Sequence, residues 1–136
     1  MWQVIHASEH FRAEHDPSHA LIRLTRLPSE LAPEQVDVAF APLVQALEPW
    51  AGQRLLIDLR LSRGNNDPLL EAQVRRWLMR LAQLFPRSAL VVATAVGQLH
   101  VQRMERQAGH DHRNVFFRVE DAEAALMAAP LSAPSD

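Results

Sequence analysis

The sequence lacks two residue types that carry much of protein chemistry, cysteine and lysine. The absence of cysteine excludes disulfides, thiolate nucleophiles and cysteine-based zinc sites. All 14 basic residues are arginine, so a Schiff-base lysine and the lysine of a nucleotide-binding P-loop are excluded as well. Arginine suits carboxylate or anion recognition, but charged side chains usually lie on the surface, and we interpret most of these arginines as solvated.

Long apolar runs and a strong charge imbalance are also missing. The apolar stretches span only a few residues, and the N-terminal MWQVIHASEH has neither a basic nor an apolar region, so we expect no membrane span and no signal peptide. The expected location is therefore the cytoplasm. A formal net charge of −2 also predicts no nucleic acid partner, because such a partner requires a basic face.

The chain does contain enough apolar material for one core. Its 136 residues are 48% hydrophobic, which suffices for one globular domain without disulfides or metals. We predict that this domain spans residues 1–128 and that residues 129–136 form a flexible tail.

The most informative segment runs from Arg54 to Thr94. Two short, nearly continuous apolar runs at 54–60 and 88–94 flank an amphipathic helix expected over 68–85. Strands buried on both faces of a parallel sheet cannot alternate with polar residues, so this order predicts two parallel strands and a crossover helix. Asp67 is the expected N-cap of the helix, and Pro68 its first residue. The stripe facing the core is Leu70, Val74, Trp77, Leu78, Leu81 and Phe85.

The other predicted elements complete a mixed α/β sheet. Short strands at 2–7, 10–15 and 19–27 form an antiparallel N-terminal group. Polar Arg23 and Thr25 place the third of these strands toward an edge or on a half-exposed face. A helix over 33–48 contains Pro42, which predicts a kink or a break into two helices. The chain then continues with a helix over 96–108, a strand over 114–118 and a helix over 121–128.

Particular segments within this order match a known pattern. They are the LLIDLR strand at Leu55 to Arg60, the Asn66-Asp67 helix start, the ALVVAT strand at 89–94, Gly97, and the ending NVFFRVEDAEAAL. Through them the chain resembles, from Val4 to Leu126, the SpoIIAA-like or STAS superfamily, the domain of anti-sigma factor antagonists and sulfate transporter tails. The resemblance implies a mixed sheet with helices largely on one face. It also implies a non-enzymatic interaction module, since such domains act chiefly by binding, some of them to nucleotides, lipids or anions.

The chain departs from that family at its regulatory position. Regulated antagonists carry a phosphorylatable serine at the start of the helix after the central strand, where the helix N-terminus senses added charge. Here the residues are Asn66, Asp67 and Pro68, none of which has a hydroxyl. Ser62 lies earlier in the loop, and we interpret it as a turn residue. A phosphorylation switch at this helix is therefore not predicted.

A ligand, if one binds, is expected beyond the carboxyl ends of the parallel strands, where open α/β sheets form a crevice. The loops after 54–60 and 88–94 would line it with Arg60, Arg63, Asn65, Asn66, Thr94 and Gln98. Two arginines and two helix N-termini favour a small anionic ligand, and the family resemblance adds a lipid-like one. The alternative is that these residues only cap the loops.

A partner protein is expected on the outer face of the 68–85 helix. Arg75, Arg76 and Met79 combine arginine with an apolar side chain, as the centres of interfaces do. Arg103 and Arg106 on the next helix have similar character, and helices joined across one parallel strand tend to lie side by side. We call these five residues the arginine patch. Its predicted partner is an acidic protein surface or a second copy of the chain.

Other chemistry is less favoured by the sequence. The seven histidines, including those in His110-Asp111-His112, have no established metal-ligand spacing, so we interpret them as surface residues and predict no metal and no cofactor. Asp58 in its apolar strand is interpreted as a buried carboxylate satisfied by loop amides or an arginine. The expected function is a non-enzymatic, cytoplasmic protein-interaction or regulatory module. A binder of a small anionic or lipid-like ligand is the alternative, and a histidine-dependent metalloenzyme is a third.

Overall fold

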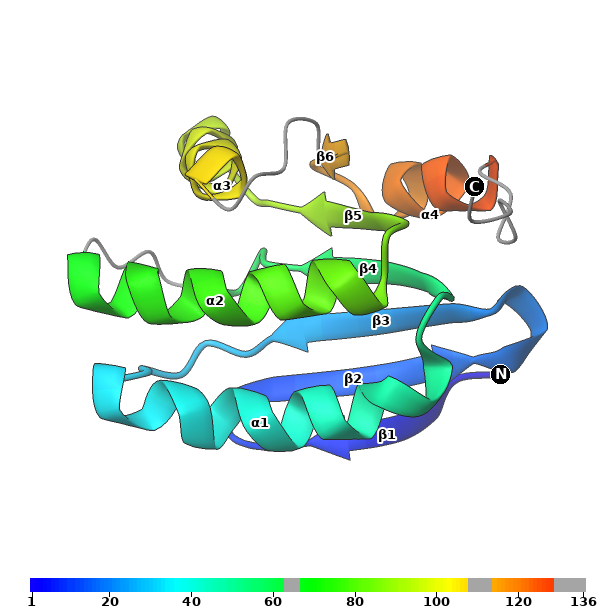
Figure 1. Ribbon diagram of the computed structural model, residues 1–136. Coiled ribbons are helices and arrows are strands. Elements are labelled where there is room, and N and C mark those ends of the chain that lie inside the picture. Colours follow the sequence, from blue (N-terminus) through cyan, green and yellow to red (C-terminus); the bar gives the residue numbers. More distant parts are fainter. Residues whose placement is uncertain (63–66, 108–113, 129–136) are drawn as a thin grey trace.

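The structure is a computed structural model that describes residues 1–62, 67–107 and 114–128, with only the backbone at 100, 101, 104–107 and 114. Within these residues, six strands form one mixed sheet whose order follows the chain (Figure 1). The strands are β1 (Gln3–Ala7), β2 (Phe11–Asp16), β3 (Leu21–Arg26), β4 (Arg54–Asp58), β5 (Ser88–Val91) and β6 (Asn114–Phe116). β1, β2 and β3 are antiparallel neighbours, whereas β3 to β6 are parallel. The predicted α/β fold class is confirmed.

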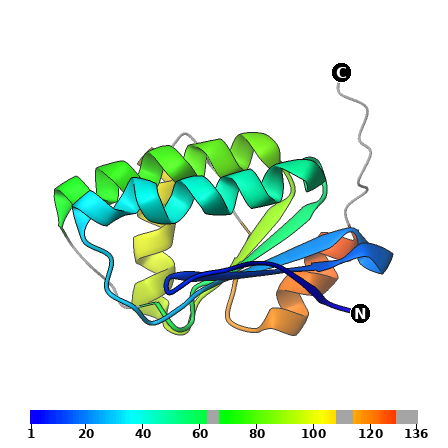
Figure 2. The same ribbon diagram turned by 90° about the horizontal axis from the view of Figure 1, so that it is seen from below.

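The helices lie on both faces of the sheet (Figure 2). α1 (Val36–Leu47) and α2 (Pro68–Leu84) lie together on one face, and α4 (Val119–Ala128) packs against β4, β5 and β6 on the other. The helices were expected largely on one face. α1 and α2 share a face, whereas α4 lies on the opposite one. α3 (Ala95–Gln107) contacts α2, and it is seen along its axis in Figure 1 and at a steep angle to α2 in Figure 2. The expectation that these two helices lie side by side on the sheet is wrong. Short 3₁₀ helices occupy Pro17–His19, Pro33–Gln35 and Glu48–Trp50.

Two apolar cores result from this arrangement. The larger core lies under α1 and α2 and includes Leu55 and Ile57 of β4. The smaller core lies under α4 and includes Leu56 of the same strand, with Leu126 of the helix. Because successive strand residues point to opposite faces, β4 contributes to both cores. This double burial is the reason why the three central residues of β4, Leu55 to Ile57, are all apolar.

The start of α2 forms as the sequence predicts. Asp67 is the N-cap, its Oδ1 accepts a hydrogen bond from the backbone N–H of Leu69 at 2.9 Å, and Pro68 is the first helical residue. Leu70, Leu81 and Phe85 of the predicted stripe are buried. The cap fixes where the loop after β4 ends and the helix begins.

Pro42 does not break α1, which continues from Val36 to Leu47. The predicted break into two helices is therefore wrong. A proline removes the hydrogen bond to the carbonyl four residues earlier, which here belongs to Val38. Both residues are exposed, so water can solvate that carbonyl and the cost of the missing bond is reduced.

β3 is an internal strand of the sheet, paired with β2 and β4. Its predicted place toward an edge is wrong, although its second face is half-exposed as the alternative had it. Arg23 on that face donates from Nη2 to Glu123 Oε1 of α4 at 2.8 Å, and its guanidinium lies 4.9 Å from the centre of the Trp2 ring. An internal strand tolerates this arginine because α4 covers only part of the face.

Two further predictions concern the C-terminal tail and a membrane span. The expected tail at 129–136 lies outside the described residues. Among the described helices, none is long and apolar enough to cross a membrane.

Candidate functional site

The carboxyl ends of the parallel strands meet at one edge of the sheet. β3, β4, β5 and β6 are paired in the same direction, and Figure 1 shows the arrowheads of β3, β4 and β5 pointing the same way. The segments that follow these strands therefore lie at a common edge, which we call the carboxyl edge. The predicted ligand crevice belongs to this edge.

Asp58 ends β4 and is only 6% exposed at the carboxyl edge. Arg60 turns back onto it, donating from Nε to Oδ1 at 2.9 Å, from Nη2 to Oδ2 at 2.8 Å, and from its backbone N–H to Oδ1 at 3.0 Å. Burial would raise the pKa of Asp58, but the hydrogen bonds and charge of Arg60, with the charge of Arg23, hold that pKa below its ordinary value. Asp58 is thus the satisfied carboxylate that the sequence predicted.

The pairing with Asp58 also determines what Arg60 can do. Its hydrogen bonds to the carboxylate raise the pKa of the guanidinium, and two of its donor nitrogens are occupied. An anion that bound Arg60 at this place would compete with a bidentate carboxylate. The main arginine of the predicted crevice is therefore already engaged.

Thr94 acts as a helix cap at the start of α3. Its Oγ1 accepts a hydrogen bond from the backbone N–H of Gly97 at 3.0 Å, and its carbonyl accepts from the N–H of Gln98 at 3.0 Å. A Cβ at position 97 would lie 3.3 Å from Thr94 Oγ1, which is tighter than usual, so the glycine keeps this turn close. For Thr94 the structure agrees with the capping alternative.

Of the four remaining predicted ligand residues, the structure describes one. Gln98 is half-buried in the first turns of α3. Arg63, Asn65 and Asn66 lie outside the described residues. The structure therefore brings Arg60, Thr94 and Gln98 to one edge and gives two of them partners within the chain.

Sequence reasoning missed the exposed apolar side chains at this same edge. Leu61 (52% exposed) follows β4, Phe117 (47%) follows β6, and the first turns of α2 and α3 carry Leu69 (59%), Val96 (77%) and Leu99 (66%). We call these five residues the apolar edge. A sequence signal existed for Phe117, because it extends the apolar end of β6 by one residue beyond the last pair, at Phe116. It was assigned to the predicted strand over 114–118, whereas Leu61 was assigned to the turn after the strand over 54–60.

The arginine patch is less continuous than predicted. Arg76 and Met79 are exposed on the outer face of α2, whereas Arg75 is half-buried and its Nε has no hydrogen-bond partner among the described residues. Arg103 donates from Nη2 to Glu71 Oε1 at 2.6 Å, which ties α3 to the first turn of α2. The side chain of Arg106 lies outside the described residues.

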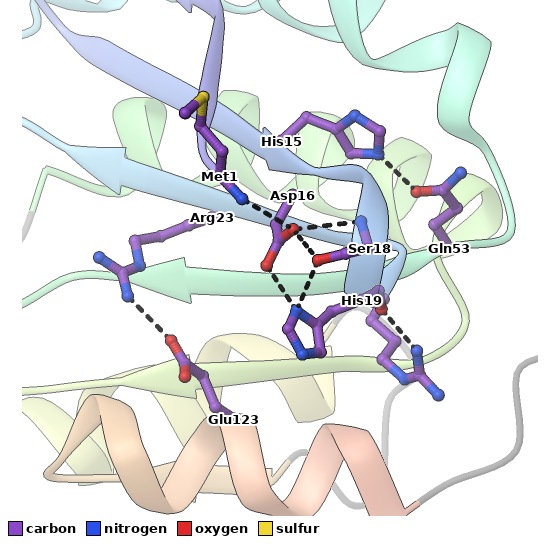
Figure 3. Close-up of polar contacts among 9 residues, drawn as sticks. Met1, His15, Asp16, Ser18, His19, Arg23, Gln53 and Glu123 are labelled. Atoms are coloured by element: carbon purple, nitrogen blue, oxygen red, sulfur yellow. Dashed lines mark hydrogen bonds and ion pairs between the residues drawn. The ribbon is translucent and has the colours of Figure 1, made fainter.

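A separate polar cluster lies at the opposite edge, between β2 and β3 (Figure 3). The carboxylate of Asp16 accepts from Ser18 Oγ at 2.6 Å and lies 2.6 Å from His19 Nδ1. These hydrogen bonds from Ser18 and His19 lower the pKa of Asp16 to about 2. Asp16 caps the 3₁₀ turn Pro17–His19, so the cluster has a structural role. In the described part of the chain, histidines and carboxylates form no group suited to a metal ion, and His110, Asp111 and His112 lie outside that part.

The fold and this edge define the class of the protein as an α/β domain with a six-stranded mixed sheet, within the described residues, and an apolar rim at the strand ends. Comparisons of the chain with family models, with curated proteins and with solved structures found no match. The resemblance to the STAS superfamily stays a prediction.

Proposed function

We propose that the chain is a non-enzymatic protein-interaction or regulatory module of STAS-like type, that it works in the cytoplasm, and that the apolar edge is its contact surface. The observation that carries this proposal is the gathering of five exposed apolar side chains at the ends of neighbouring parallel strands. Large apolar side chains grouped in this way on a monomer mark interaction sites more often than scattered ones do.

The energetics of the apolar edge support a protein partner. Removing apolar surface from water contributes about 25 cal/mol per Å², and Leu61, Val96 and Phe117 each leave about half or more of their surface exposed. Among the described residues, none of the three belongs to either core. A partner that covers them gains this burial.

The charges around the apolar edge indicate the character of the partner. Arg60 and Arg118 flank it with side chains 45% and 71% exposed. An apolar centre with an arginine rim is the usual anatomy of a protein interface. Both arginines already lie beside a carboxylate of the chain, Asp58 and Glu120, so the apolar side chains define the fitting partner, which is an apolar protein surface on another protein or on a second copy of this chain.

The test compares two surface variants of the chain. In the edge variant Leu61, Val96 and Phe117 are changed to Glu, and in the patch variant Arg76 and Met79 are changed to Glu. Light scattering measures self-association, and a partner captured by the wild type is purified and titrated against both variants. We expect both variants to keep the wild-type circular dichroism spectrum and only the edge variant to lose binding by about tenfold or more, because charged side chains replace its buried centre.

Two results would overturn the choice of surface. If only the patch variant loses binding, the contact surface is the arginine patch. If neither variant changes self-association or partner affinity, the apolar edge is not the contact surface, and the exposed face of β1 to β3 becomes the remaining candidate.

A lipid-like ligand at the same loops is the second candidate. Val96 and Leu99 supply exposed apolar surface there, while the engagement of Arg60 with Asp58 disfavours a small anion. Titration with a fluorescent fatty acid, with inorganic phosphate as a parallel arm, separates these ligands from a protein partner. Saturable fatty acid binding that is weakened by Val96→Glu would support the lipid-like ligand, binding of phosphate alone would favour the anion, and no binding in either arm would exclude this candidate.

A further inference from the structure

A serine and a histidine from distant parts of the sequence form a close pair at the carboxyl edge. His10 lies in the turn between β1 and β2, and Ser29 lies in the segment that follows β3. The distance from His10 Nδ1 to Ser29 Oγ is 2.6 Å. Both side chains are only partly exposed. A backbone hydrogen bond from the N–H of Leu27 to the carbonyl of His10, at 2.9 Å, joins the two segments.

Arg26 holds Ser29 from the other side. Its Nη1 donates to Ser29 Oγ at 3.0 Å, and its Nη2 donates to the Ser29 carbonyl at 2.8 Å. The same Nη1 also lies within hydrogen-bond distance of the carbonyls of His10 and Leu27, so its two hydrogens are shared among three acceptors. The guanidinium lies 5.6 Å from the centre of the Phe11 ring. The position of the Ser29 hydroxyl is therefore fixed by an arginine that is itself fixed by several carbonyls.

The direction of the hydrogen bond between Ser29 and His10 depends on the tautomer of His10. An arginine is only a donor, so the Ser29 oxygen accepts from Arg26. In the tautomer with the proton on Nε2, His10 Nδ1 accepts the Ser29 proton at a distance of 2.6 Å. A neutral imidazole with its proton on Nε2 completes this arrangement, since Nδ1 then carries the free lone pair. This is the relation of a nucleophilic hydroxyl to its general base.

A second Ser–His pair in the chain has the opposite arrangement and provides a control (Figure 3). Ser18 Oγ lies 3.1 Å from His19 Nδ1, but Ser18 donates its proton to Asp16 Oδ1 at 2.6 Å. His19 Nδ1 lies 2.6 Å from Asp16 Oδ2, a carboxylate, so Nδ1 must carry a proton there. A protonated Nδ1 cannot accept the Ser18 proton.

We propose that Ser29 is a nucleophilic hydroxyl, activated by His10, that accepts an acyl group from an activated ester. The Oγ proton passes to His10 Nδ1 while the Oγ–C bond forms. The bond from the acyl carbon to the leaving oxygen then breaks, and the leaving group departs with its electron pair and afterwards takes the proton from His10. Arg26, which donates to Oγ, holds the Ser29 hydroxyl in place beside His10.

Acylation of Ser29 would alter the carboxyl edge. The new ester has no hydroxyl proton for His10 and adds the bulk of an acyl group at Ser29. The inference does not depend on the proposed function, but it adds a covalent modification site at the edge that the proposed partner would contact.

The test uses 4-nitrophenyl acetate as the acyl donor. The chain has no cysteine, lysine or tyrosine, so the seven histidines are the main side chains that compete for the reagent. We expect a burst of 4-nitrophenolate that matches the protein concentration, with the acetyl group located on the Ser29 peptide by mass spectrometry. Ser29→Ala should abolish the burst, and His10→Gln should slow it by about a hundredfold or more, the usual contribution of a general base.

The controls distinguish activation from accidental acetylation. Ser18→Ala and His19→Gln should keep the wild-type burst, and all variants should keep the wild-type circular dichroism spectrum. A wild type without a burst, a burst retained in Ser29→Ala, an adduct on another residue, or equal rates in folded and urea-unfolded chains would each overturn the inference.

Discussion

Replacement of Trp77 tests how α1 and α2 are held together. The Trp77 ring stacks on Phe40 of α1, with centres 5.8 Å apart and planes 8° from parallel. Its Nε1 donates to Asp37 Oδ1, also of α1, at 2.8 Å. The side chain is half-buried and packs against the larger core. Trp77 therefore contributes apolar burial, an aromatic pair and a hydrogen bond to the contact between α1 and α2.

The expected cost of Trp77→Ala follows from these three contributions. A fully buried tryptophan costs about 3 to 5 kcal/mol when truncated to alanine, and half burial reduces that to about 2 kcal/mol. The stack adds about 0.5 to 1 kcal/mol, and the hydrogen bond, at an exposed position, about 0.5 kcal/mol. We expect a loss of about 3 kcal/mol in the free energy of unfolding, and a loss of about 1 kcal/mol for Trp77→Phe, which keeps the stack.

Urea unfolding followed by far-ultraviolet circular dichroism measures both losses without depending on tryptophan fluorescence. Asp37→Ala is the matched control. Combined with Trp77→Phe it should cost little more than either change alone, because both remove the same hydrogen bond. The reasoning is refuted if Trp77→Ala costs less than about 1 kcal/mol, or if Trp77→Phe costs as much as Trp77→Ala.

Three further predictions concern local structure. Asp67→Ala removes the cap on Leu69 and should lower the free energy of unfolding by about 1 kcal/mol; an unchanged urea midpoint would contradict this role. The pKa of the Asp16 carboxyl is about 2 in the folded chain, against an ordinary value of 3.8. Between these two pH values the unfolded chain binds more protons than the folded chain, so the free energy of unfolding should fall as the pH drops from 4 toward 2. Asp16→Asn should flatten this part of the pH profile in acid titrations, and an equally steep fall would contradict the assignment. Gly52 has φ of 90° with open space around it, so Gly52→Ala should lower stability by about 1 kcal/mol through backbone strain alone, which thermal unfolding would detect.

The central strand–helix–strand unit was predictable because its signals are local. β4 and β5 read as apolar runs since both faces of each strand are buried, and Asp67 with Pro68 marks the start of α2. The antiparallel group of β1, β2 and β3 was predictable for a similar reason, since short strands follow one another with tight turns. These features depend on residues within a few positions of one another.

Other features depend on contacts that the sequence does not reveal. The helical spacing of α3 indicates a helix but not that it crosses α2, where Arg103 pairs with Glu71. Arg60 binds Asp58 because the chain turns back within two residues. An arginine that was predicted to bind a ligand therefore pairs with a carboxylate of its own strand. Phe117 looked like a strand residue because an apolar residue just beyond the last pair has the same character as one within it. The pairing of His10 with Ser29 joins residues 19 positions apart and left no sequence motif.

Hydrogen exchange with the partner bound tests the central claim most directly. The account predicts that a captured and purified partner, or a second copy of the chain at high concentration, slows amide exchange in residues 59–62, 95–99 and 117–118. Exchange in the outer turns of α2 around Arg76 and Met79 should stay unchanged. Slowed exchange confined to α2, or to β1 and β2, with no change at the apolar edge, would contradict the claim that this edge is the contact surface.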